Sequence, residues 1–232
     1  MHSAKAAFPG QKLTGRDRLV DEIGRQHDLL RANPWQRNML LFCGYAFCAL
    51  FGHPYLMLAL AIVDCSAEML SIRLQRNLDP VASPLRYAAT LALVVIMAAC
   101  VSTAAGITWL VDDPYAKALA TGLGIITLLQ LSSVRSIHLP YGVIGMTTVS
   151  LIMLGINASH WFARDDTLGL ILSTFAALTA ITYAGLAMQA NHDLHNANAR
   201  TLAQARAADA AKGLFLAQMS HELRTPLNAI IG

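Results

Sequence analysis

Long stretches without a charged residue fill the middle of this 232-residue chain and constrain its fold more than any other feature. Between residues 38 and 189, each stretch approaches the roughly 20 residues that a helix needs to cross a bilayer. Only 13% of the residues are charged, whereas a soluble domain carries about 25%. The composition therefore argues against a water-soluble globule and predicts an all-α membrane protein. Four spans are clear from the sequence: 87–110, 118–134, 137–156 and 168–188.

The apolar region 39–72 permits two interpretations, because a Gly-His-Pro sequence at 52–54 interrupts it. It forms either one kinked span or a tight hairpin of two helices. The charge distribution favours the second interpretation, which gives six spans in all. With six spans, 15 of the 17 Lys and Arg residues lie in segments on the cytoplasmic side, in keeping with the positive-inside rule. We therefore expect a six-helix transmembrane bundle with both termini in the cytoplasm.

Two acidic residues, Asp64 and Glu68, stand near the end of this region. They are four residues apart and so share one face of a helix. Ionisable groups at membrane depth are costly and often functional, so we treat the pair as candidate signal-sensing residues that contact a proton, a cation or a ligand. In the alternative, the span ends early and both acids pair with Arg73 or Arg76 at the interface. We expect no metal site, since no Cys, His and carboxylate cluster has suitable spacing.

Both ends of the chain are more polar than the middle. Residues 1–37 contain seven basic residues and apolar positions at helical spacing, which predicts an amphipathic helix on the cytoplasmic membrane face. Residues 190–212 are rich in alanine, a strong helix former. We therefore expect the last span to continue as a signalling helix, with His192 and His195 on its solvated surface.

The last 18 residues read FLAQMSHELRTPLNAIIG. This segment resembles the H-box of the sensor histidine kinase family, which is the phosphoacceptor helix of the dimerisation and histidine-phosphotransfer domain. The resemblance implies that His221 is the phosphoacceptor, whose neutral imidazole attacks the γ-phosphorus of ATP. It also implies that Glu222 accepts a proton from the ring and orients it. Thr225 would then serve in removing phosphate from the response regulator.

Composition and the resemblance together divide the chain into four expected segments: a basic cytoplasmic segment (1–37), a six-span sensor (38–189), a signalling-helix linker (190–212) and the start of the phosphoacceptor domain (213–232). The sequence stops inside or just after the H-box and holds no Gly-rich ATP-binding motif. We expect ATP and Mg²⁺ to bind a further domain of a longer kinase, simple or hybrid, and this fragment alone to be inactive. The resemblance further implies a phosphorelay in a bacterial inner membrane, a homodimer and a response-regulator partner; we expect no nucleic-acid partner.

Two other functions fit the same composition. A six-span transporter would use Asp64 and Glu68 to bind its cargo, and inverted repeats would mark it. The break at 52–54 has no counterpart in the second half of the sequence, which argues against that class. A membrane anchor that localises and dimerises a kinase without sensing anything is equally consistent with the composition. The motif around His221 favours the sensor kinase over the transporter.

Overall fold

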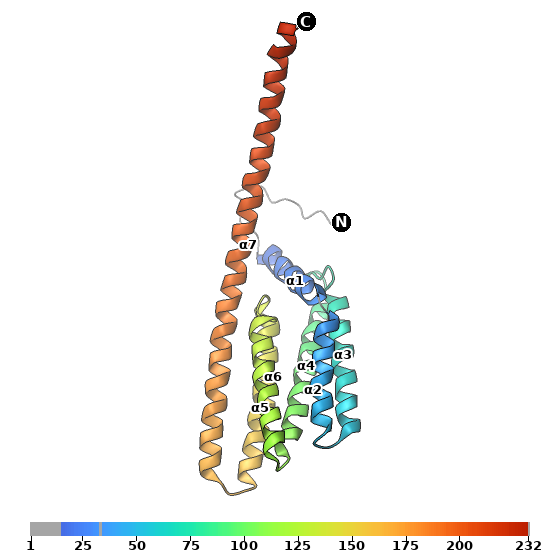
Figure 1. Ribbon diagram of the computed structural model, residues 1–232, viewed down its shortest axis with the longest axis vertical. Helices are drawn as coiled ribbons and strands as arrows, with labels where there is room; N and C mark the ends of the chain where they lie inside the picture. The colour runs from blue at the N-terminus through green and yellow to red at the C-terminus, as the bar shows by residue number, and fades with distance from the viewer. Residues whose placement is uncertain (1–14, 33, 232) are drawn as a thin grey trace. The chain divides into compact units, whose positions relative to one another are not determined.

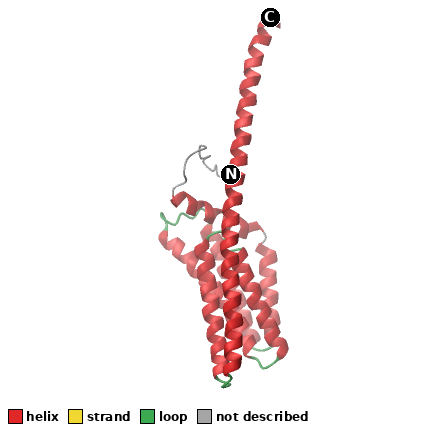
Figure 2. Ribbon diagram, turned by 90° about the vertical axis from the view of Figure 1, so that its left-hand side faces the viewer, coloured by secondary structure: helices red, strands yellow, loops and turns green. Residues whose placement is uncertain are grey.

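The computed structural model describes residues 15–32 and 34–231, and every regular element within them is an α-helix (Figure 2). Side chains are described in these ranges except at residue 217 and residues 221–231. The predicted all-α fold is confirmed. The helices of the described residues are α1 (Gly15–Ala32), α2 (Pro34–Ala49), α3 (Pro54–Gln75), α4 (Pro84–Leu110), α5 (Pro114–Ser133), α6 (Leu139–Phe162) and α7 (Thr167–Ile231).

Proline begins several of these helices. It lacks a backbone N–H and its φ angle is already helical, so it suits the first turn. Pro54, Pro84 and Pro114 occupy that turn in α3, α4 and α5. Before α5, the Asp113 side chain also accepts hydrogen bonds from the backbone N–H groups two and three residues later. The residues that interrupt the apolar stretches thus set the helix boundaries.

In the part of the chain that the structure describes, five helices, α3 to α7, are long and apolar enough to cross a membrane. The ambiguous region 39–72 forms two helices, α2 and α3, which run side by side in opposite directions (Figure 1). Gly52 and His53 join them with positive φ angles of 144° and 53°, the left-handed region in which glycine is favoured. The region is therefore a hairpin rather than one kinked helix. With 16 residues, α2 is shorter than each of the five other apolar helices.

Contacts divide the described residues into two compact units, which meet at the boundary between residues 192 and 193. In the first unit, α4 is central and packs against α3, α5 and α6, while α2 and α1 both pack against α3 (Figure 1). In the second unit, the described residues are those of α7 from 193 to 231. The first unit therefore contains all the helix-to-helix packing considered below.

A glycine of α6 leaves room for a side chain from the first part of α7. Met188 of α7 is buried beside Met146 and Val149 of α6. A Cβ atom at Gly142 would collide with the sulfur of Met188. Without a shift of the Met188 side chain, a larger residue at position 142 would not fit.

Candidate functional site

The predicted phosphoacceptor residues lie in helix α7. His221, Glu222 and Thr225 have helical backbone there. Their side chains fall outside those that the structure describes, so the roles implied by the resemblance stay predictions. In a helix, His221 and Thr225 are about one turn apart and share a face, whereas Glu222 is rotated by about 100° from His221.

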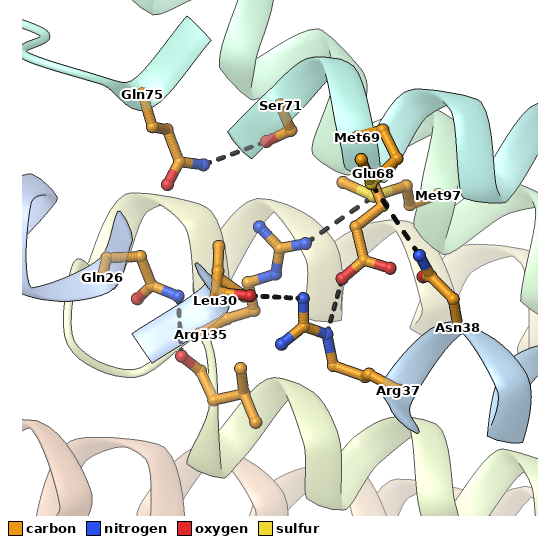
Figure 3. Close-up of polar contacts among 11 residues, drawn as sticks. Gln26, Leu30, Arg37, Asn38, Glu68, Met69, Ser71, Gln75, Met97 and Arg135 are labelled. Atoms are coloured by element: carbon orange, nitrogen blue, oxygen red, sulfur yellow. Dashed lines mark hydrogen bonds and ion pairs between the residues drawn. The ribbon is translucent and has the colours of Figure 1, made fainter. Parts of the chain in front are cut away.

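The two acids of α3 are buried inside the helix bundle. Asp64 and Glu68 each expose 2% of their surface. The hydroxyl of Tyr45, on α2, donates a hydrogen bond to Asp64 Oδ2 at 2.9 Å. Arg37, also on α2, forms an ion pair with Glu68 in which Nε and Oε1 are 2.6 Å apart (Figure 3). The Arg37 Nη2 donates a second hydrogen bond to the carbonyl oxygen of Leu30 at 2.8 Å.

These partners differ from the ones that the sequence suggested. Among the described residues, neither acid pairs with Arg73 or Arg76 as the interfacial alternative required. Arg73 is five residues beyond Glu68, which places it about 140° away around the helix axis. The α2–α3 hairpin instead brings Arg37 opposite Glu68 from 31 positions earlier in the chain. Both acids are therefore buried between helices, and their partners lie on α2.

A cavity of about 50 Å³ lies beside the two acids, and Arg135 from the connection between α5 and α6 also lines it. The Arg135 Nη2 is 3.7 Å from the sulfur of Met97. Burial lowers the pKa of Arg135, and the charge of Glu68 opposes this effect. Within the described structure, Glu68 Oε2 and Arg135 Nη1 are buried without a hydrogen-bond partner. One unpaired acceptor and one unpaired donor suit a water molecule or a ligand group that offers both functions.

The connection between α5 and α6 is buried and held by α1. Gln26 of α1 donates from Nε2 to the carbonyl oxygen of Val134 at 2.8 Å (Figure 3). His138 has no exposed surface, and its Nδ1 donates to Glu22 Oε2 at 3.2 Å. The Nε2 of the same ring is 3.0 Å from the Tyr87 hydroxyl, within hydrogen-bond distance. Burial alone would raise the pKa of Glu22, but the hydrogen bond and charge of His138 lower it below its usual value.

Helix α7 also binds this connection. Asn191 donates from Nδ2 to the carbonyl oxygen of Ser132 at 3.0 Å. The Nδ1 of His192 donates to the carbonyl oxygen of Ser136 at 2.9 Å. The expectation that His192 lies on a solvated surface is therefore wrong, because its ring is half-buried against this connection. Residues on α1 and α7 thus contact one short segment, 132–138.

Several of these residues were not identified from the sequence. Arg135 carried a usable signal, since it is a single cation between two apolar stretches and such groups are often functional. Arg37 was counted with the basic amino-terminal segment, although the structure places its side chain against Glu68. Tyr45 and His138 carried no signal, because their roles depend on which helices pack together.

The comparisons with known proteins concern the carboxyl-terminal segment. Residues 211–232 match the His Kinase A (phospho-acceptor) domain. This match agrees with the resemblance of the last 18 residues to an H-box. A 31-residue stretch is 74% identical to the circadian input-output histidine kinase CikA of Synechococcus elongatus. That stretch is 13% of this chain and spans 4% of the relative's length. No solved structure matches the chain.

Proposed function

We propose that this chain is the membrane sensor and the first phosphoacceptor segment of a bacterial sensor histidine kinase that acts in a phosphorelay, simple or hybrid. The observation that carries the proposal is the match of residues 211–232 to the phosphoacceptor domain. The apolar helices α3 to α7 support a membrane location in the same polypeptide. The four segments of this protein are then the basic segment 1–37, the sensor 38–189, the linker 190–212 and the domain start 213–232.

His221 is the proposed phosphoacceptor. Its imidazole nitrogen forms a bond to the γ-phosphorus of ATP as the bond from that phosphorus to the bridging oxygen of ADP breaks. Glu222 takes the proton from the other ring nitrogen and stabilises the imidazolium. The phosphoryl group then passes to an aspartate of a response regulator, and Thr225 assists its later removal. ATP and Mg²⁺ bind a separate domain, and the phosphoacceptor helices pair in a homodimer.

Six spans with both termini in the cytoplasm remain the topology that we favour. Helix α2, with 16 residues, is about 24 Å long, somewhat less than the roughly 30 Å hydrocarbon core. A short span is accommodated by local thinning of the bilayer or by flanking side chains that extend to the interface. Trp35 at the start of α2 is 78% exposed, which suits an interfacial anchor. The basic residues then lie almost entirely inside.

We infer that the segment 132–138 relays a change in the bundle to α7. Arg135 of this segment shares a cavity with Asp64 and Glu68, the proposed sensing pair. Asn191 and His192 bind carbonyl groups of the same segment. Those two residues belong to the helix that continues to His221. These contacts form a continuous connection from the acid pair to α7. A ligand or proton that binds the acid pair can therefore shift the position of α7 if segment 132–138 has two arrangements.

Replacing the sensor tests whether residues 1–189 sense a signal or only anchor the protein in the membrane. Residues 1–189 are replaced by an unrelated six-span anchor in a protein that also carries the ATP-binding domain implied by the resemblance. Phosphorylation in membranes is then compared across a panel of growth conditions. We expect the natural protein to vary its phosphorylation and the chimera to remain constant. Equal variation in both proteins would leave residues 1–189 as an anchor alone.

Point variants of the acid pair provide a finer test. Asp64→Asn and Glu68→Gln keep the side-chain size and remove the negative charge. We expect either change to alter the stimulus-dependent part of the phosphorylation. An unchanged response in both variants would remove the acid pair from the sensing role.

A further inference from the structure

A groove of about 540 Å³ lies between α2, α4 and α5. Its volume falls in the range of about 300–1,000 Å³ that is typical of small-molecule sites. Apolar side chains form most of the lining, among them Leu40, Phe47, Leu123 and Ile126. The groove therefore suits a flexible apolar chain.

The groove has a polar end. Leu41, Val101, Thr127 and Gln130 line both the groove and the 50 Å³ cavity beside the acid pair. Arg37 lines the groove as well, and it pairs directly with Glu68. A molecule whose chain lies in the groove can thus place one end next to the buried polar cluster.

The polar cluster favours an uncharged end. The cluster contains two acids, Asp64 and Glu68, and two cations, Arg37 and Arg135. Their formal charges sum to zero, so the ligand needs no ionic head group. Among the residues that the structure describes, Glu68 Oε2 has no donor and Arg135 Nη1 has no acceptor, and both residues are more than nine-tenths buried. A hydroxyl group supplies both functions, since it donates one hydrogen bond and accepts others.

We propose that the groove and the cavity form one binding site for an uncharged single-chain amphiphile such as a long-chain alcohol. Its hydroxyl group binds Glu68 and Arg135, and its alkyl chain lies between α2 and α5. The proposal deepens the sensing function by naming the class of signal, and it rests on that function only for the effect on His221. Binding itself stands on the geometry alone.

The first test measures binding by the complete 232-residue chain in nanodiscs of dioleoylphosphatidylcholine without nucleotide. The probe is a dodecanol analogue that carries a photoreactive diazirine on its chain, and labelled peptides are mapped by mass spectrometry. We expect labels on α2 and α5. Unlabelled dodecanol should displace the probe at a bilayer mole fraction about tenfold lower than dodecane does, a factor equal to about 1.4 kcal/mol. Dodecanoate should compete no better than dodecane.

A matched pair of variants tests the location. Ile126 lines the groove, whereas its neighbour Ile125 does not, and the two are 55% and 51% exposed. Ile126→Trp should fill the groove and reduce labelling on the order of fivefold, while Ile125→Trp should leave it unchanged. Far-UV circular dichroism verifies that both variants fold into helices. If one variant misfolds, competition by dodecanol and dodecane on the unaltered chain still decides the proposal.

Two outcomes would overturn the proposal. Equal competition by dodecane and dodecanol would mean that the groove holds bilayer acyl chains only. Equal labelling of the Ile126→Trp and Ile125→Trp variants would place the probe outside the groove. Because neither readout uses ATP, such a failure would leave the phosphoacceptor role of His221 untouched. Loss of that role would likewise leave the binding result standing.

Discussion

Replacement of Glu68 by alanine removes the carboxylate that neutralises Arg37 inside the bundle. The Glu68 side chain is 3% exposed and the Arg37 side chain 18%, so little water can replace the lost partner. Removing one partner of a buried pair costs about 3–5 kcal/mol. Arg37 retains its hydrogen bond to Leu30 and some access to solvent. We therefore expect the lower end of that range, about 3 kcal/mol of unfolding free energy.

A double-mutant cycle separates the pair from its surroundings. Arg37→Ala combined with Glu68→Ala should be less destabilised than the sum of the two single variants by about 2 kcal/mol, because no charge is left unpaired. The matched control is Asp21→Ala. Asp21 pairs with Arg25 on α1, but its side chain is 57% exposed, so this change should cost less than about 1 kcal/mol.

The assay follows unfolding of the purified chain in detergent micelles by circular dichroism during titration with sodium dodecyl sulfate. The observable is the free energy of unfolding extrapolated to zero denaturant. If Glu68→Ala were no more destabilising than Asp21→Ala, the ion pair would not be buried as the structure has it. Strict additivity of the double variant would show that Arg37 and Glu68 do not interact.

The contacts around segment 132–138 lead to two further predictions. Asn191→Ala should remove a contact to this segment and weaken the dependence of phosphorylation on stimulus several-fold, while Asn198→Ala on the same helix should not; equal effects would refute the relay. For Glu22, burial raises the pKa, but the hydrogen bond and charge of His138 lower it by more, so the folded-state pKa lies below the ordinary 4.5. Glu22 therefore stabilises the fold above about pH 4.5 and loses that effect as the pH falls through its folded-state pKa. The difference in Tm between the natural chain and Glu22→Gln should be constant near neutral pH and shrink below pH 4.5, and a difference independent of pH would contradict this assignment.

The helices could be predicted where a local feature determines them. Uncharged length anticipated α4, α5, α6 and the start of α7, because it is a property of one segment alone. The hairpin of α2 and α3 stayed ambiguous, since glycine and proline at 52–54 fit a kink as well as a turn. The positive φ angles at Gly52 and His53 show a turn rather than a kink. They depend on how α2 and α3 pack against each other, which the sequence of the turn does not show.

The partners of the acid pair could not be predicted in the same way. The four-residue spacing of Asp64 and Glu68 fixed their common face, but not the helix that faces them. That choice depends on the rotation of α2 about its axis, which a sequence with weak amphipathic character does not define. His192 was misplaced for a related reason, because a polar residue on a helix can bind a buried backbone as readily as water.

The most direct test of the phosphoacceptor claim uses a protein in which residues 1–232 are joined to an ATP-binding domain of the class that the resemblance implies. It is incubated in membranes with ATP radiolabelled at the γ-phosphate, and acid-labile, base-stable label on the protein is measured. The account predicts label on the natural protein and on a His195→Gln control, and none on His221→Gln. Undiminished label on His221→Gln would contradict it.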